Sequence, residues 1–198
     1  MGTIKTTNIE PIADNGTVTL GSSGDTFTVP SGVTITNSGT ATGFGGDNTP
    51  AFSAYIGSNQ TLSDSTDTKA DFDTEEFDTD SAYDTSNKRF TVPSGEGGKY
   101  FFNARGRFYM SANQSQFVIA IRKNGSEVAK KYIYSGAVGT KIFNSTTYFS
   151  YDISAVETLS VGDYVEVFVK SDDTGGNNIT FESGTIQSEF SGYKLIGV

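Results

Sequence analysis

The sequence predicts an all-β protein, a β-sandwich or jelly roll built of many short strands. Its 198 residues include 15 Phe, 10 Tyr and 23 Gly, with many Thr, Ser and Val, so strand-favouring and turn-favouring residues dominate. Segments that alternate apolar and polar residues recur at intervals of roughly ten residues, each closed by Gly, Pro or Asn. No segment has the apolar period of an amphipathic helix.

Composition divides the chain into residues 1–46 and residues 47–198. The first part has short alternating segments, at 17–20, 26–29 and 33–36, with turn residues between them. Its large apolar groups are too few to form a core of its own. We therefore expect residues 1–46 to be a β-rich attachment or fibre segment that needs sister chains or another protein to cover its apolar side.

Residues 47–198 are expected to form a separate head domain. A clean alternation predicts its first strand at 51–56, and an acidic stretch follows from Asp64 to Asp84. Asn124-Gly125 lies between two apolar segments and predicts a tight hairpin. Further strands are predicted near 88–93, 99–110, 115–123, 127–135, 141–152, 163–170, 178–182 and 186–197.

One hexapeptide occurs twice. Phe-Thr-Val-Pro-Ser-Gly occupies residues 27–32 and again residues 90–95. The plain interpretation is a strand that ends in a Pro-Ser-Gly turn and is used in both parts of the chain.

Charge and composition disfavour several classes of function. The net charge of −9 disfavours nucleic acid and anionic membranes as partners, and we expect neither. No signal segment or membrane-spanning stretch is apparent, which suggests folding in a cytoplasm. The chain has no Cys and no His, so the thiolate ligands, the commonest metal ligand and the usual general base are missing. We expect no enzymatic activity, no catalytic residues and no organic cofactor.

The acidic stretch is the one feature that suggests a metal. Carboxylates at Asp71, Asp73 and Glu75 are weak candidates for calcium ligands, because calcium prefers hard oxygen donors. The spacing lacks the Gly and the distal Glu of a calcium loop. The alternative is a solvated acidic surface, anchored to the core by Phe72 and Phe77.

Two further groups of side chains leave two interpretations open. Tyr132, Tyr134, Tyr148 and Tyr151 suggest either a binding surface or ordinary strand packing, which we favour. The basic pairs Arg105/Arg107 and Lys130/Lys131 are either ordinary strand-surface charges or lie opposite the acidic stretch of a neighbouring copy.

Several short motifs resemble the globular head of complement one-q, which shares its jelly roll with tumour necrosis factor. In chain order they are Pro50-Ala51-Phe52-Ser53-Ala54, Phe90-Thr91-Val92-Pro93, Gly98-Lys99-Tyr100-Phe101-Phe102, Ile121-Arg122-Lys123-Asn124-Gly125, Leu159-Ser160-Val161-Gly162-Asp163-Tyr164-Val165 and Ser188-Glu189-Phe190-Ser191-Gly192-Tyr193-Lys194-Leu195. The resemblance implies a ten-strand jelly roll that assembles as a compact homotrimer. It places side chains from its central strands in the sandwich core or at the trimer axis, namely Tyr100, Phe102, Val165, Val167, Phe190, Tyr193 and Leu195.

Residues 1–46 resemble the Thr- and Gly-rich β segments of structural proteins of tailed bacteriophages. Together the two resemblances imply a virion structural protein, assembled in the host cytoplasm. It would be a trimeric head-decoration (capsid-decoration), fibre or neck component that binds other virion proteins through residues 1–46. The alternative is a receptor-binding adhesin for host attachment, which holds a host-surface glycan or protein at the trimer tip. A glycan-degrading enzyme with paired carboxylates is a third hypothesis.

Overall fold

The computed structural model describes residue 9 and residues 16–38, 48–110, 113–135, 142 and 145–196. The chain divides into two units, Met1–Phe44 and Gly45–Val198. The composition had placed the boundary two residues further along, between residues 46 and 47. Among the described residues there is no helix long and apolar enough to cross a membrane.

In the N-terminal unit, residues 16–38 run as extended segments joined by two turns. The N–H of Asp25 donates to the carbonyl oxygen of Ser22 at 3.0 Å, and the N–H of Val33 donates to that of Pro30 at 3.2 Å. The segments expected to be strands form no ladder within this part of the chain. A strand needs a neighbour for its backbone groups, and one thin segment offers none. Phe27 is accordingly 69% exposed.

The repeated hexapeptide forms the same turn in both units. Gly32 and Gly95 each have φ near +84°, and in each copy the N–H after the Gly donates to the Pro carbonyl at 3.2 Å. A positive φ at this turn position is the reason for Gly. The surroundings differ, because Phe90 of the second copy is 1% exposed whereas Phe27 of the first is open to solvent.

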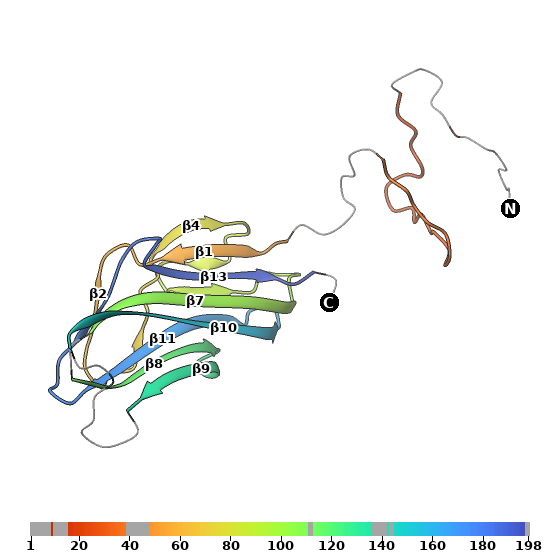
Figure 1. Cartoon of the computed structure of the whole chain (residues 1–198). Coiled ribbons are helices and arrows are strands. Elements are labelled where there is room, and N and C mark those ends of the chain that lie inside the picture. Colours follow the sequence, from red (N-terminus) through yellow and green to blue (C-terminus); the bar gives the residue numbers. More distant parts are fainter. Residues whose placement is uncertain are drawn as a thin grey trace. The chain divides into compact units, whose positions relative to one another are not determined.

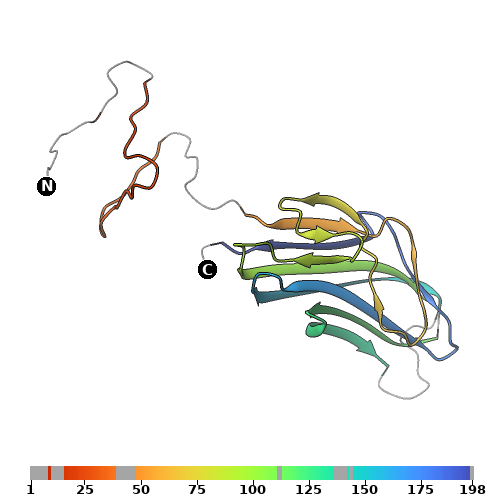
Figure 2. The same ribbon diagram turned by 180° about the vertical axis from the view of Figure 1, so that it is seen from behind.

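The head unit is a sandwich of two antiparallel sheets, and Figures 1 and 2 show them facing each other. Sheet A has the order β2 (Gln60–Leu62), β12 (Ile179–Phe181), β7 (Gly98–Met110), β13 (Ser188–Lys194), β1 (Ala51–Tyr55) and β4 (Thr74–Asp78), and β10 (Thr147–Leu159) pairs along the whole of β7. Sheet B has the order β5 (Tyr83–Asp84), β6 (Arg89–Thr91), β11 (Tyr164–Asp173), β8 (Gln114–Lys123) and β9 (Ser126–Tyr134), and β3 (Thr68–Lys69) pairs with β11.

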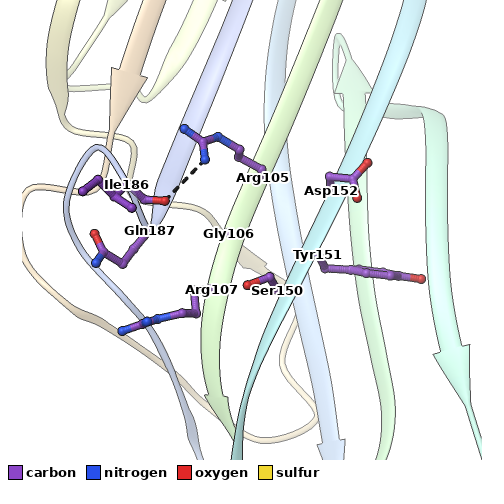
Figure 3. Close-up of a pocket in the computed structure, with 8 residues that line it drawn as sticks. All are labelled: Arg105, Gly106, Arg107, Ser150, Tyr151, Asp152, Ile186 and Gln187. Carbon is purple, nitrogen blue, oxygen red and sulfur yellow. Dashed lines mark hydrogen bonds between the residues drawn. The ribbon is translucent and has the colours of Figure 1, made fainter.

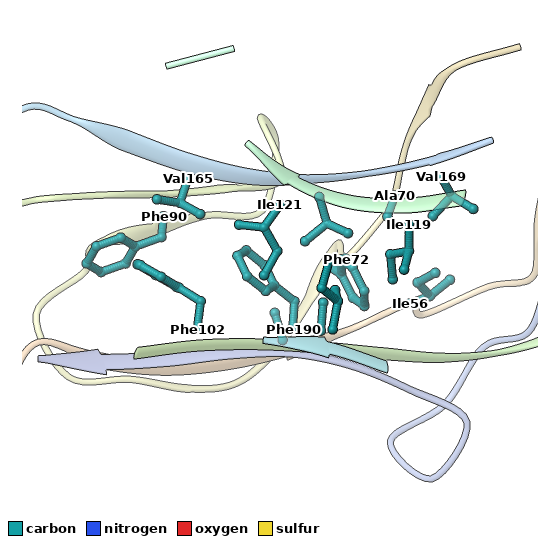
Figure 4. Close-up of a cluster of buried hydrophobic side chains, with 14 of the residues drawn as sticks. Ile56, Ala70, Phe72, Phe90, Phe102, Ile119, Ile121, Val165, Val169 and Phe190 are labelled. Carbon is teal, nitrogen blue, oxygen red and sulfur yellow. The ribbon is translucent and has the colours of Figure 1, made fainter. Parts of the chain in front are cut away.

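An aromatic core fills the space between the sheets (Figure 4). The ring of Phe52 stacks on Tyr83 at 4.8 Å and on Phe90 at 5.2 Å, and meets Phe190 edge-on at 5.0 Å. Ring pairs at such distances add to the free energy gained from area burial alone. The core therefore ties both sheets together through side chains far apart in the sequence.

The hairpin predicted at Asn124-Gly125 is confirmed. It joins β8 to β9, and both residues have positive φ, 50° and 79°. This is the type I′ geometry whose twist matches that of two paired strands.

Two expectations about elements are corrected. The strand expected at 141–152 is β10, which begins at Thr147 and runs seven residues further, to Leu159. Residues 141, 143 and 144 of the expected strand lie outside the described residues. The acidic stretch is part of the sandwich, because β3, β4 and β5 lie within it, and the described residues contain thirteen strands where ten were expected.

The two aromatic anchors expected in the acidic stretch behave differently. Phe72 is 1% exposed and belongs to the core, as predicted. Phe77 is 51% exposed, so the prediction for it is wrong. Phe77 lies on β4 at the end of the sheet A order, where Glu75, Glu76 and Phe77 are all exposed and the pairing with β1 shifts register between Ser53 and Ala54.

Candidate interface on the outer face of sheet A

The outer face of sheet A, which we call the A face, is formed by alternate side chains of three adjacent strands. Tyr100, Phe102, Ala104 and Phe108 of β7 are fully buried in the core, so the residues between them point outward. The register places outward residues of β13 and β10 beside them. The A face comprises Phe101, Asn103, Arg105, Arg107 and Tyr109 of β7, Glu189, Ser191 and Tyr193 of β13, and Tyr148, Ser150, Asp152, Ser154 and Val156 of β10.

One end of the A face is apolar. The rings of Phe101 and Tyr193 lie 5.4 Å apart, and Val156 pairs with Phe101 on the neighbouring strand. Val156 is 58% exposed and Tyr193 is 39% exposed. A soluble sheet normally presents polar side chains to water, so this end offers apolar surface for contact with another molecule.

A charged row crosses the middle of the A face. Arg105 Nε donates to Glu189 Oε2 at 2.8 Å. Asp152, on the neighbouring strand β10, lies opposite Arg105 in the register. The other two guanidinium nitrogens of Arg105 donate to the carbonyl oxygens of Ile186 and Thr185, at 3.3 and 3.2 Å. The loop between β12 and β13 therefore holds the Arg105 guanidinium in a fixed orientation.

A cavity of about 390 Å³ opens beside this row (Figure 3). Its lining residues are Arg105, Gly106, Arg107, Ser150, Tyr151, Asp152, Ile186 and Gln187. Asp152 is the one carboxylate among them, whereas hydrolysis of a glycosidic bond commonly uses two. The cavity suits a side chain of a partner, because it combines fixed guanidinium groups with the exposed Ile186.

Aromatic rings occupy the other end of the A face. The rings of Tyr109 and Tyr148 are 5.1 Å apart, and the guanidinium of Arg107 lies 4.7 Å from the Tyr148 ring. Arg107 also forms an ion pair with Glu182. Tyr109 and Tyr148 are 44% and 56% exposed. Tyr is favoured at protein interfaces because its large ring also carries a polar group.

Strands β9 and β10 lie next to each other beside the A face. Among the strands of the described residues, β10 pairs only with β7 and β9 pairs only with β8, so both lie at sheet edges. The ammonium of Lys131 lies 4.4 Å from the Tyr151 ring and donates to the carbonyl oxygen of Asp152 at 3.1 Å, which links the two edges. Burial, followed by the charge of Asp152, raises the pKa of the Tyr151 phenol.

The structure separates the seven side chains expected in the core or at a trimer axis. Tyr100, Phe102, Val165, Val167 and Phe190 lie in the sandwich core. Tyr193 is on the A face, and Leu195 follows the end of β13 and is half-buried. Sequence reasoning missed Phe101 and Val156, although Phe101 stands among polar residues at the outward positions of its strand, and that exception is a usable signal.

Two of the three calcium candidates have other partners, and the third is exposed. Asp71 forms an ion pair with Lys88 at 3.2 Å, and Asp73 Oδ1 accepts the N–H of Gly57 at 2.8 Å. Glu75 is exposed on β4. In the described part of the chain, no group of three or more Asp and Glu side chains is placed to hold a metal ion.

The structure also gives the surroundings of the four tyrosines and the two basic pairs. Tyr151 packs against Phe117 at 5.5 Å, as expected for strand packing. Tyr132, Tyr134 and Tyr148 are more than half exposed, although Tyr148 also packs against Tyr109 and Arg107 at the surface. The charges of the basic pairs are matched within the chain, since Arg105 and Arg107 pair with Glu189 and Glu182, and Lys130 and Lys131 with Glu127 and Asp152.

No protein-family model matches the sequence, and no curated protein matches it. Solved structures do match. The globular domain of zebrafish complement 1qA protein is similar at 16% identity, with 74% of this chain and 97% of that chain covered and a TM-score of 0.48. The structure of the Eiger TNF from S. frugiperda is similar at 13% identity, with 75% of this chain and 93% of that chain covered and a TM-score of 0.50. The latter likeness shows a jelly roll of the tumour-necrosis-factor type, and at this identity it shows the fold alone.

Proposed function

We propose that this protein is a non-enzymatic structural component of a virus particle, a homotrimer that decorates the head or forms part of a fibre or neck. Three copies associate through the A face, and residues 1–46 bind other virion proteins. The jelly-roll heads project from the particle. Its function is assembly, and no chemical step is involved.

The main support for the proposed trimer is the apolar end of the A face. Phe101, Val156 and Tyr193 gather apolar surface on a sheet that would otherwise face water. A stable obligate interface buries about 2,000 Å² or more. The adjacent edges of β9 and β10 supply a second surface, which a neighbouring copy covers in a closed ring.

The attachment role rests on the N-terminal unit. Val18, Leu20, Phe27, Val33 and Ile35 are each at least 40% exposed within residues 16–38. A segment that has turns and alternating apolar groups but no core needs an external surface to fold against. The virion context is supported by the resemblance of this Thr- and Gly-rich segment to phage β segments.

Deletion of residues 1–46 tests this division of roles. The truncated chain should melt cooperatively, because the core lies within residues 52–190, and it should no longer be incorporated into particles. Electron microscopy of intact particles with the full-length chain should locate it on the capsid, neck or tail. A truncated chain that aggregates, or that is incorporated normally, would contradict the proposal.

The same microscopy separates the proposed role from the alternative of a receptor-binding adhesin. An adhesin should lie at a tail tip, with its loops directed away from the particle. A decoration protein should instead lie in a regular array on the capsid.

A further inference from the structure

The outer face of sheet B, which we call the B face, presents two exposed tyrosines of β9. Phe117, Ile119 and Ile121 of β8 are fully buried in the core, so the residues between them point outward. Tyr132 of β9 pairs with the outward Val118, and Tyr134 pairs with the outward Gln116. Tyr132 is 62% exposed and Tyr134 is 53% exposed. Being two residues apart on one strand, they lie about 7 Å from each other along it.

A shallow cavity of about 270 Å³ is lined by Gln116 and Val118, the β8 residues that pair with Tyr134 and Tyr132. Its apolar lining residues are Val118, Ala120 and Phe168, of which Val118 and Ala120 are only 8% and 2% exposed. The register sets Phe168 beside Ala120 and Lys170 beside Val118. Ligand sites commonly range from about 300 to 1,000 Å³. This cavity is below that range, so it suits one ring of a longer ligand.

The rim of the cavity mixes hydrogen-bond donors and acceptors. It carries the cations Arg122, Lys130 and Lys170 and the carboxylates Asp67 and Glu127. Arg122 is held by an ion pair with Asp67 and lies 4.0 Å from the Phe168 ring, and Lys130 pairs with Glu127 at 3.2 Å. Such a rim has little net charge, and the chain as a whole carries −9, which repels anionic polymers.

These features together fit the chemistry of a neutral sugar. A hexose ring has a C–H face that packs on an aromatic ring, and hydroxyls that both donate and accept hydrogen bonds. Tyr provides a rigid amphipathic contact area at a low cost in conformational entropy. Two such rings in line, with Gln116 and Lys170 beside them, match consecutive sugars of a chain.

We propose that the B face binds a neutral hexose polysaccharide. Tyr132 and Tyr134 stack on successive sugar rings, and Gln116, Lys130 and Lys170 contact the hydroxyls. This binding role goes beyond the structural role proposed above and does not depend on the trimer, because all its residues come from one copy.

Affinity electrophoresis of the full-length chain tests the proposal, with dextran, mannan or galactan cast into native gels and alginate as an acidic comparison. At least one neutral polysaccharide should retard the protein, and 0.5 M salt should leave the retardation unchanged. The double variant Tyr132→Ala/Tyr134→Ala should lose at least about tenfold in affinity, since stacking contributes most of the contact. Its melting temperature should stay close to that of the parent, because both side chains are exposed.

Two control variants sharpen the result. Phe77→Ala removes an aromatic ring of similar exposure, 51%, from sheet A and should bind normally. Tyr132→Phe/Tyr134→Phe keeps the stacking surface and should retain most of the affinity. The proposal is overturned if no neutral polysaccharide retards the protein, if the double Ala variant binds like the parent, or if only alginate retards it in a salt-sensitive way.

Discussion

Successive side chains along β7 point alternately into the sandwich core and onto the A face. Phe102 is fully buried, whereas its neighbour Phe101 lies on the A face and contacts Tyr193. The alternation of a strand assigns these opposite environments to two identical side chains. Side-chain type alone therefore does not predict role at this scale, and position within the strand decides it.

Replacing Phe102 by Ala should lower the free energy of unfolding by about 3–5 kcal/mol, because it leaves a cavity among Phe52, Phe90 and Phe190. Urea denaturation measures the change. Phe77→Ala, at an exposed position, should cost less than about 1 kcal/mol and is the control. Equal losses in the two variants would show that the core has been wrongly assigned.

Asp163 stabilises the corner that leads into β11. Its carboxylate accepts hydrogen bonds from the Asn124 amide at 2.7 Å and the Ser160 N–H at 2.8 Å, and lies 3.0 Å from the Lys123 ammonium. These contacts, the Asn124 hydrogen bond first, lower the pKa of Asp163 from 3.8 to about 2. The folded state therefore favours the ionised carboxylate.

The stability that comes from Asp163 should be lost in acid. Because its folded pKa is below its unfolded value, the contribution is complete above about pH 4 and disappears as the pH falls toward about 2. Asp163→Asn should be less stable than the parent at about pH 6, and the gap between their urea midpoints should narrow by about pH 2.5. A gap that is constant over this range would contradict this assignment.

At the scale of elements, local signals in the sequence predicted well where the backbone alone determines the structure. The Asn124-Gly125 turn is one example, because its positive φ values demand those residue types. Strands that depend on distant partners were harder. Strand β10 continues to Leu159 because β7 pairs with it over its full length. The sequence of residues 153–159 alone does not indicate the end of the strand, since the end depends on the length of β7. The acidic stretch joins the sheets in part for the same reason, because β3 pairs with the distant β11.

Close packing of backbone against rings constrains β13. A Cβ on Gly192 would lie 2.5 Å from Phe102 and 2.9 Å from Phe52, closer than real contacts allow. Gly192→Ala should therefore destabilise the head by about 1–3 kcal/mol through overpacking. Thermal unfolding of Gly97→Ala is the matched control, since its added Cβ would meet only ordinary contacts, the nearest at 3.6 Å. If both variants melt alike, the rings move aside and the packing argument fails.

At the scale of the whole molecule, the two units differ in how they bury their apolar side chains. The head has an aromatic core of its own, whereas residues 16–38 keep their apolar groups in solvent. The two copies of Phe-Thr-Val-Pro-Ser-Gly show this contrast in one sequence, since Phe90 and Val92 are buried in the head whereas Phe27 is exposed in the N-terminal unit. The sequence predicted the contrast from composition, but it did not reveal the A face. Recognising that face requires knowing that β10 and β13 flank β7.

The A face explains why a sandwich with a complete core should still associate. Phe101, Val156 and Tyr193 remain available for a second contact after the core has formed. The variant Phe101→Glu/Tyr193→Glu introduces charges there without touching the core. It is therefore expected to fold and to remain monomeric, because an unpaired charge is costly to bury in an interface.

Sedimentation equilibrium of the full-length chain at micromolar concentration is the most direct test of the central claim that three copies assemble through the A face. The parent should sediment with three times the mass of the chain, and the Phe101→Glu/Tyr193→Glu variant with the mass of one chain at an unchanged far-ultraviolet circular dichroism spectrum. A parent that is monomeric at this concentration, or a variant that remains a trimer, would contradict the account.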